Sequence, residues 1–428
     1  MNRIITKTDA LRGELTVPAD KSISHRAIML GALASGRSVV RNFLRAEDPI
    51  STMNAFRSLG IAIADNGTEV VIDGKGIRGL QEADEVIDCG NSGTTMRLIA
   101  GVLAGNPFFS VLTGDASLRS RPMGRIIAPL RQMGAEIMAR GDGRYAPLAI
   151  RGVALKPITY TLPIASAQVK SCVLLASLAI EGCTRVVEPG QSRDHTERML
   201  KSMGADITVG TMRASLTGGR ELQPFEMTVP SDFSSAAFFI AAALVVPKSE
   251  ILLRGVGVNP SRTGMLEIIK RMGATVTLEN IREVSGEPVA DIVCAAPDLL
   301  KPVSIGAGDV SLAIDEFPVL CILASQADGT TLIRGAKELR VKESDRIAAM
   351  AQGLRRMGVL IEEFEDGIAV SGKAKLRGAE IETFHDHRIA MAFSVAGLIA
   401  EGQTTIRNAE CVDVSFPGFY ECMERISR

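Results

Sequence analysis

Six short polar clusters stand out because each opens an apolar stretch long enough to form a helix. The clusters are Asp20–Ser24, Asn91–Thr94, Ser166–Gln168, Asp232–Ser235, Asp315–Glu316 and Asp386–Arg388. The first turn of a helix carries unpaired N–H groups and a partial positive charge, so helix starts of this kind favour anions. Two clusters also contain a cation, Lys21 or Arg388. The clusters therefore predict binding of phosphates or carboxylates.

Helix capping is the alternative explanation for the same clusters, since Ser, Asp and Asn are the preferred N-caps of any helix. Capping accounts well for four of the residues, namely Ser22, Asn91, Ser166 and Asp232. It does not account for Lys21 or Arg388, because a cation at a helix start opposes the helix dipole. The anion-site interpretation is therefore the stronger one.

Other residues that could do chemistry carry weaker signals. His385 and His387 lie close together, but no third metal ligand is evident and no metal or other cofactor is expected. His195 is expected to be a structural hydrogen-bonding residue. The segment Gly255–Gly257 matches neither the dinucleotide fingerprint nor a phosphate-binding P-loop.

Composition excludes several classes of partner. The 428-residue chain has a formal net charge of −1, 4% aromatic residues and no Trp, which argues against a nucleic-acid or acidic-membrane partner. The most apolar stretch, Ala236 to Val246, is shorter than the roughly 20 residues that span a bilayer and is predicted to be a buried helix. The seven cysteines are scattered without metal-ligand spacing, and the N-terminus has no secretory pattern. A cytoplasmic, soluble protein is expected.

Two phrases recur along the chain and predict an internal repeat. The first joins the apolar end of a helix, a turn and a β-rich run, as in Ile180–Val186 and Ala327–Ile333, and recurs about every 70 residues. The second joins a basic helix end, a Gly cap and a strand, as in Arg131–Ala135 and Lys270–Ala274. The chain is therefore expected to contain six helix–strand–helix–strand units with further short strands between them.

The sixth unit predicts how the repeats divide. Its second helix, around Phe419 to Ile426, has no strand after it, and the strands near Arg3–Ile5 and Gly13–Val17 could complete that half of the molecule. Similar phrases at Val17–Asp20 and Val229–Asp232 indicate where the halves join. We therefore expect an α/β protein of two domains with three repeats each. One domain comprises residues 1–17 plus 231–428 and the other residues 18–230, with crossovers near 18 and 230.

The polar clusters closely resemble those of the 5-enolpyruvylshikimate-3-phosphate (EPSP) synthase family, also called 3-phosphoshikimate 1-carboxyvinyltransferase. The matching stretches are Pro18–Arg26, Gly90–Arg97, Arg119–Met123, Leu162–Ser171, Val341–Arg346 and Asp386–Met391. They span nearly the whole chain in the family's order. The resemblance implies an enolpyruvyl transferase-like fold: two domains, each of three βαβαββ-type units with buried helices.

The activity implied by this resemblance is transfer of the enolpyruvyl group of phosphoenolpyruvate to the 5-hydroxyl of shikimate-3-phosphate by addition and elimination, with release of phosphate, in the chorismate pathway to aromatic amino acids. The family's phosphoenolpyruvate-binding residues correspond to Lys21, Gly93, Arg121, Gln168, Arg346 and Arg388. Its shikimate-3-phosphate-binding residues correspond to Lys21, Ser22, Arg26, Ser166, Gln168, Asp315 and Lys342. Asp315 is the candidate base for the 5-hydroxyl, and Glu343, with Lys21 as its rival, is the candidate acid for C3. A monomer acting on small molecules is expected.

Two departures from the family pattern concern the phosphoenolpyruvate side. Leu98 stands where many members have Pro, and Val414 stands where some members place a Lys. Gly93 suggests room for glyphosate, the family's known inhibitor, and either departure could alter sensitivity to it.

Two alternative functions stay open at this point. UDP-N-acetylglucosamine enolpyruvyl transferase shares the fold and the donor, but its reactive Cys has no counterpart in Thr113–Arg119. A non-catalytic repeat protein that binds anions or an RNA end would show no turnover. The retained Asp315, Glu343 and set of cations argue against such a scaffold.

Overall fold

The computed structural model describes residues 1–427, and this part of the chain divides into two compact units. Unit 1 comprises Met1–Pro18, Pro230–Glu283 and Pro288–Arg428, and unit 2 comprises Ala19–Val229 and Val284–Glu287. The chain changes unit at Pro18 and Val229, beside the crossovers expected near 18 and 230. The four residues 284–287 differ from the expected division, because this hairpin turn packs with unit 2: Arg198 donates to the Gly286 carbonyl oxygen at 3.3 Å.

Unit 2 contains three four-stranded sheets, one for each repeat. The strands are β14 (Glu226–Thr228), β3 (Ser35–Arg41), β5 (Glu69–Lys75) and β4 (Ala62–Asp65); β6 (Ile87–Asp88), β7 (Phe109–Thr113), β9 (Tyr145–Arg151) and β8 (Glu136–Ala139); β10 (Thr159–Thr161), β11 (Cys183–Val187), β13 (Arg213–Thr217) and β12 (Asp206–Gly210). In each sheet the first two strands are parallel, and the third strand is antiparallel to its neighbours.

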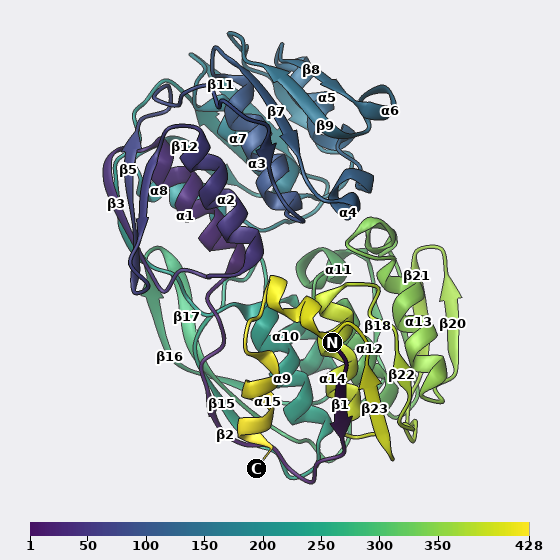
Figure 1. Ribbon diagram of the computed structural model, residues 1–428. Coiled ribbons are helices and arrows are strands. Elements are labelled where there is room, and N and C mark those ends of the chain that lie inside the picture. The colour runs from purple at the N-terminus through teal and green to yellow at the C-terminus, as the bar shows by residue number, and fades with distance from the viewer. Residues whose placement is uncertain (428) are drawn as a thin grey trace. The chain divides into compact units, whose positions relative to one another are not determined.

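Unit 1 has a similar arrangement, with two four-stranded sheets and one three-stranded sheet among its described residues (Figure 1). Its strands are β2 (Arg12–Leu15), β15 (Glu250–Gly257), β17 (Glu287–Ala295) and β16 (Val276–Val284); β18 (Ser304–Ile305), β19 (Thr330–Ile333), β21 (Gly367–Ser371) and β20 (Ile361–Phe364); β22 (Glu380–Ile381), β23 (Gln403–Ile406) and β1 (Arg3–Thr6). The N-terminal strands complete two of these sheets: β2 pairs in parallel with β15, and β1 pairs antiparallel with β23 in the register Arg3↔Ile406. Both N-terminal strands thus lie in sheets of unit 1.

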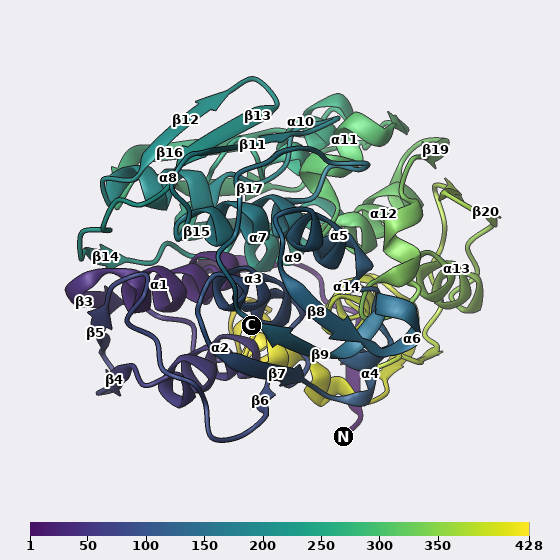
Figure 2. The same ribbon diagram turned by 90° about the horizontal axis from the view of Figure 1, so that it is seen from above.

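Each repeat also contributes one helix that is almost wholly buried. These helices are α1 (Lys21–Leu33), α3 (Gly93–Ala104) and α7 (Ala167–Ser177) in unit 2, and α9 (Phe233–Val245), α12 (Phe317–Gln326) and α14 (His387–Gly397) in unit 1. Within unit 1, α9, α12 and α14 pack against one another, and within unit 2, α3 packs on both α1 and α7 (Figures 1 and 2). Such burial requires sequences that are apolar on all sides, as the Ala- and Phe-rich run of α9 illustrates. The predicted fold with buried helices is therefore confirmed.

A second set of helices is amphipathic and covers the repeats. They are α2 (Glu47–Ser58), α5 (Gly124–Gln132), α8 (His195–Ser202), α10 (Gly264–Arg271), α13 (Arg346–Arg356) and α15 (Phe419–Ile426). The remaining short helices are α4 (Ala116–Ser120), α6 (Arg140–Gly143), α11 (Ala307–Ala313), η1 (Lys337–Val341) and η2 (Ala409–Val414). Helix α15 has the predicted bounds. The glycine of every copy of the second phrase has a positive φ, between 83° and 103°, which ends the helix as predicted.

Candidate substrate-binding sites on the two units

Lys21 is the first residue of α1, and its ammonium group is held by a carboxylate. Asp20 caps the helix by accepting a hydrogen bond from the Ile23 N–H at 2.8 Å. The Lys21 Nζ lies 3.2 Å from Asp48 Oδ2, at the start of α2. Ser22 lies inside the helix, so the alternative explanation by capping does not apply to it. With the cap at Asp20, two residues before Ser22, Lys21 lies at the N-terminal end of α1, where anions are favoured.

Gly93 is the first residue of α3, and two guanidinium groups lie beside it. Ser92 caps this helix, so the alternative explanation by capping does not apply to Asn91. Asn91 instead accepts from Arg121 through its carbonyl oxygen at 3.1 Å and its Oδ1 at 2.6 Å. A Cβ at Gly93 would lie 2.6 Å from Arg97 Nη1 and 3.7 Å from Arg121 Nη1. The absence of a side chain at Gly93 therefore leaves space next to two cations.

Gln168 joins this group from the start of α7. Its Oε1 accepts from Arg97 Nη1 at 2.7 Å, and its Nε2 donates to Thr94 Oγ1 at 3.0 Å. Ser166 caps α7, as its position in the sequence predicted. The structure thus brings Gly93, Arg121 and Gln168 together. Arg97 was not predicted as a site residue, although its position four residues after Gly93, one helical turn away, was a usable signal.

Arg26 lies one turn after Ser22 and is buried in unit 2. Its Nη1 donates to the Ser22 carbonyl oxygen at 3.0 Å, and its Nε and Nη2 donate to the hydroxyls of Thr196 and Ser171. The preceding residue, His25, is also buried, and burial together with the charges of Lys21 and Arg26 holds the pKa of His25 well below its usual value. A neutral imidazole therefore lies next to these two cations.

In unit 1, Arg346 opens α13 and lies among three carboxylates. Its side chain is 1% exposed. Its Nε lies 2.9 Å from Asp386 Oδ2, its Nη2 lies 2.6 Å from Glu343 Oε2, and its Nη1 lies 3.5 Å from Asp315 Oδ1. Burial disfavours the charge of Arg346, but Asp386, Glu343 and Asp315 outweigh it and raise the pKa of Arg346. Arg346 is therefore a fixed positive charge.

Asp315 lies between two cations, because Arg388 approaches it from α14. Arg388 Nη1 donates to the Asp315 carbonyl oxygen at 3.0 Å, and Nη2 lies 3.5 Å from Oδ2. Asp386 caps α14 by accepting from the Arg388 N–H at 2.9 Å, and it also binds Arg346. The structure therefore brings together Asp315, Glu343, Arg346 and Arg388. Asp386 organises them, a role that the sequence did not predict.

Lys342 belongs to the same region of unit 1. Its Nζ lies 3.9 Å from Glu338 Oε1, and burial lowers the pKa of the ammonium group although nearby carboxylates oppose this effect. The neighbouring residue Val341 is exposed.

Leu98, one of the two departures from the family pattern, lies on α3 and is fully buried in the hydrophobic core of unit 2. Among the residues that the structure describes, no group of three or more His, Cys, Asp and Glu side chains could hold a metal ion.

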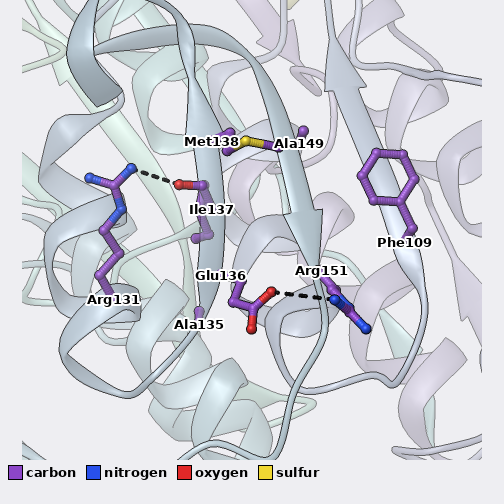
Figure 3. A pocket seen from close by; sticks show the side chains of 8 residues that line it. All are labelled: Phe109, Arg131, Ala135, Glu136, Ile137, Met138, Ala149 and Arg151. Atoms are coloured by element: carbon purple, nitrogen blue, oxygen red, sulfur yellow. Dashed lines mark hydrogen bonds and ion pairs between the residues drawn. The ribbon is translucent and has the colours of Figure 1, made fainter.

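A hollow of about 510 Å³ on unit 2 contains none of the candidate residues (Figure 3). It lies over the sheet formed by β6 to β9, and its lining includes Phe109, Met138 and the ion pair between Arg151 and Glu136. Arg131 donates to the Ile137 carbonyl oxygen at its edge. Its two arginines already contact Glu136 and the Ile137 carbonyl oxygen, and none of the residues expected to bind anions lines this hollow.

Comparisons with known proteins agree with one family. A family model described as EPSP synthase (3-phosphoshikimate 1-carboxyvinyltransferase) matches residues 5–423. A protein named 3-phosphoshikimate 1-carboxyvinyltransferase from Thermodesulfovibrio yellowstonii is 54% identical over 430 residues, covering 100% of both chains. One of the same name from Geotalea daltonii is 54% identical, and the match covers 97% of both chains.

No helix within residues 1–427 has both the length and the apolar character needed to cross a membrane.

Solved structures give the same result. EPSP synthase from Acinetobacter baumannii superposes with a TM-score of 0.88 at 49% identity, covering 99% of this chain and 98% of that one. The enolpyruvyl transferase NikO from Streptomyces tendae superposes with a TM-score of 0.78 at 18% identity, covering 99% and 96%. The second likeness supports the fold alone.

Proposed function

Since the chain belongs to the EPSP synthase (3-phosphoshikimate 1-carboxyvinyltransferase) family, we infer that it transfers the enolpyruvyl group of phosphoenolpyruvate to the 5-hydroxyl of shikimate-3-phosphate. The two alternative functions, transfer to a sugar nucleotide and non-catalytic anion binding, are not favoured by these relatives. The observation that carries the assignment of a catalytic role is the position of Asp315 beside the guanidinium groups of Arg346 and Arg388.

The phosphoenolpyruvate-binding residues are proposed to be Lys21, Gly93, Arg121, Gln168, Arg346 and Arg388. This donor carries a phosphate and a carboxylate, and both match the planar donor pattern of Arg. The guanidinium groups of Arg121 and Arg346 are oriented by hydrogen bonds to Asn91 and Asp386. Such pre-set donors lose little conformational entropy when an anion binds.

The shikimate-3-phosphate-binding residues are proposed to be Lys21, Ser22, Arg26, Ser166, Gln168, Asp315 and Lys342. Lysine acts as a compact charge for a phosphate, and the helix starts that carry Lys21 and Ser166 offer further backbone donors. Asp315 removes the proton of the 5-hydroxyl as that oxygen attacks C2 of phosphoenolpyruvate. The guanidinium groups of Arg346 and Arg388 stabilise the negative charge of the Asp315 carboxylate.

A proton must reach C3 of phosphoenolpyruvate as the new C–O bond forms. Glu343 is the proposed donor, and Lys21 is its rival. The tetrahedral intermediate then returns a proton from its C3 methyl group to the group that donated it and breaks its C2–O bond to phosphate, which restores the double bond and releases inorganic phosphate. Acid–base assistance of this type contributes about 10²–10⁴-fold to a rate.

We further propose that the two compact units are two domains and that the protein is a cytoplasmic monomer without a nucleic-acid or membrane partner. The near-zero net charge and low aromatic content support this proposal, as do seven free cysteines, which are typical of a reducing compartment. Light scattering coupled to size-exclusion chromatography tests the monomer, whose mass would be 45.5 kDa.

The activity is tested by phosphate release with phosphoenolpyruvate and either shikimate-3-phosphate or UDP-N-acetylglucosamine as acceptor. Turnover is expected only with shikimate-3-phosphate. Turnover with the sugar nucleotide alone would overturn the assignment, and no turnover with either acceptor would favour a binding protein.

A further inference from the structure

Two neighbouring residues of α7 are joined to two neighbouring residues of α8 by buried polar contacts. The Lys170 Nζ lies 2.7 Å from Glu197 Oε1, and the Ser171 Oγ lies 2.7 Å from Thr196 Oγ1. All four side chains are at most 3% exposed. We call these four residues the α7–α8 ladder.

The ladder ends on Arg26 of α1, which lies next to α8 (Figure 1). The Arg26 Nε donates to Thr196 Oγ1 at 2.7 Å, and its Nη2 donates to Ser171 Oγ at 2.9 Å. Two hydroxyls therefore accept from two different nitrogens of one guanidinium group. Because that group is planar, two such contacts fix both its position and the direction in which its plane faces.

Lys170 also anchors the segment that precedes α8. Its Nζ lies 2.7 Å from Glu188 Oε2, and the Ser192 hydroxyl donates to the other oxygen of Glu188. Burial alone would lower the pKa of Lys170, but Glu197 and Glu188 outweigh it and raise the pKa. The charged Lys170 thus holds the start of α7 against residues 188–197. Ser166 and Gln168 belong to this helix start and are therefore fixed with it.

We propose that Ser171 and Thr196 are positioning residues for shikimate-3-phosphate, because their hydroxyls orient the Arg26 guanidinium group while Lys170 fixes the start of α7. This inference rests on the proposed function and deepens it. Two of the proposed acceptor-binding residues of unit 2, Arg26 and Ser166, are bonded directly to the ladder, whereas Arg121, proposed to bind the donor alone, is oriented by Asn91 and Ser117. Damage to the ladder should therefore weaken acceptor binding more than donor binding.

The test compares Thr196→Val with Thr196→Ser. Valine has the shape of threonine without the hydroxyl, so Arg26 loses an acceptor, whereas serine keeps it. Loss of one hydrogen bond to a charged group corresponds to about a 10- to 100-fold change in binding. We expect KM for shikimate-3-phosphate to rise by that factor in Thr196→Val, KM for phosphoenolpyruvate to change by less than about threefold, and Thr196→Ser to restore the parent values.

Thr184→Val provides a matched control, because Thr184 is buried in β11 of the same unit and its Oγ1 makes no hydrogen bond within the described residues. This control should leave both KM values unchanged. If Thr196→Val fails to fold, Ser171→Ala carries the test, since it removes the other hydroxyl that accepts from Arg26. Melting temperatures establish that each variant is folded.

Unchanged KM for shikimate-3-phosphate in a folded Thr196→Val or Ser171→Ala protein would refute the positioning role. Equal rises in both KM values would also refute it, because they would indicate a general structural defect. A parent protein without turnover on shikimate-3-phosphate would instead overturn the proposed function, and the ladder proposal with it.

Discussion

Replacing Gly93 by alanine should weaken binding of phosphoenolpyruvate without lowering the stability of the fold. The backbone of Gly93 does not have a positive φ, so alanine is accommodated there without backbone strain. Its new Cβ would, however, lie 2.6 Å from Arg97 Nη1, which is well inside ordinary contact distance. The contacted atom is the far end of a flexible side chain, so Arg97 is expected to move rather than the helix.

The size of the effect follows from the hydrogen bond that Arg97 makes. Restoring ordinary contact requires Nη1 to retreat by about 0.8 Å, which is enough to break its 2.7 Å bond to Gln168 Oε1. A hydrogen bond involving a charged group contributes about 1.5–3 kcal/mol, so KM for phosphoenolpyruvate should rise by about 10- to 100-fold. Stability should not fall, because alanine favours helix by about 0.5–1 kcal/mol over glycine.

Steady-state phosphate release at varied phosphoenolpyruvate, together with thermal melting, measures both quantities. Gly101→Ala is the matched comparison in the same helix, since a Cβ there would lie 2.2 Å from the backbone oxygen of Cys172. That variant should lower the melting temperature, because backbone is less able to move than the end of a side chain. A Gly93→Ala protein with parental KM for phosphoenolpyruvate would refute the reasoning about Arg97 and Gln168.

Three further perturbations test other parts of the structure. Asp315→Ala should cut turnover at least about 100-fold while calorimetry still detects shikimate-3-phosphate binding, and near-normal turnover would remove its role as base. Asp386→Asn removes the fully buried one of the three carboxylates around Arg346 and should cost about 3–5 kcal/mol of unfolding free energy in urea; a loss below about 1 kcal/mol would contradict this. The Gly255 N–H, then Asn280 and Arg254, lower the pKa of Asp291 from 3.8 to about 2. The stability from this shift is present above pH 3.8 and is lost as the pH falls towards 2. Asp291→Asn should therefore have a lower free energy of unfolding than the parent at pH 7, and this difference should shrink between pH 3.8 and pH 2. A difference that stays constant over those pH values would refute this.

The repeat pattern was sufficient to predict much of the fold. Gly caps followed by β-rich runs marked the helix ends, and the absence of a strand after Phe419–Ile426 indicated that strands from elsewhere complete unit 1. Helix starts were less predictable. Asp20, Ser22 and Ser24 are all good capping residues, so composition alone does not identify which of them is the cap. The structure selects Asp20.

The candidate site was predictable where a motif carries it and unpredictable where tertiary contacts create it. Lys342, Glu343 and Arg346 lie in one short stretch, and their resemblance to a known motif identified them. The contact of Arg26 with Thr196 joins residues 170 positions apart, and neither residue has a local signal for the other. Asp386 was expected only as part of a cluster, because its bond to Arg346 depends on how α13 and α14 pack.

The pairing of β1 with β23 and of β2 with β15 has a consequence for synthesis of the chain. At about 5–20 residues per second, the partner of β2 near residue 250 is translated roughly 10–50 s after β2, and the partner of β1 near residue 403 roughly 20–80 s after β1. Residues 19–229 are contiguous and include β14, so most of unit 2 can fold during that interval. The leading segment meanwhile offers unsatisfied strand edges, which makes nascent chains of intermediate length the ones most in need of a holding chaperone.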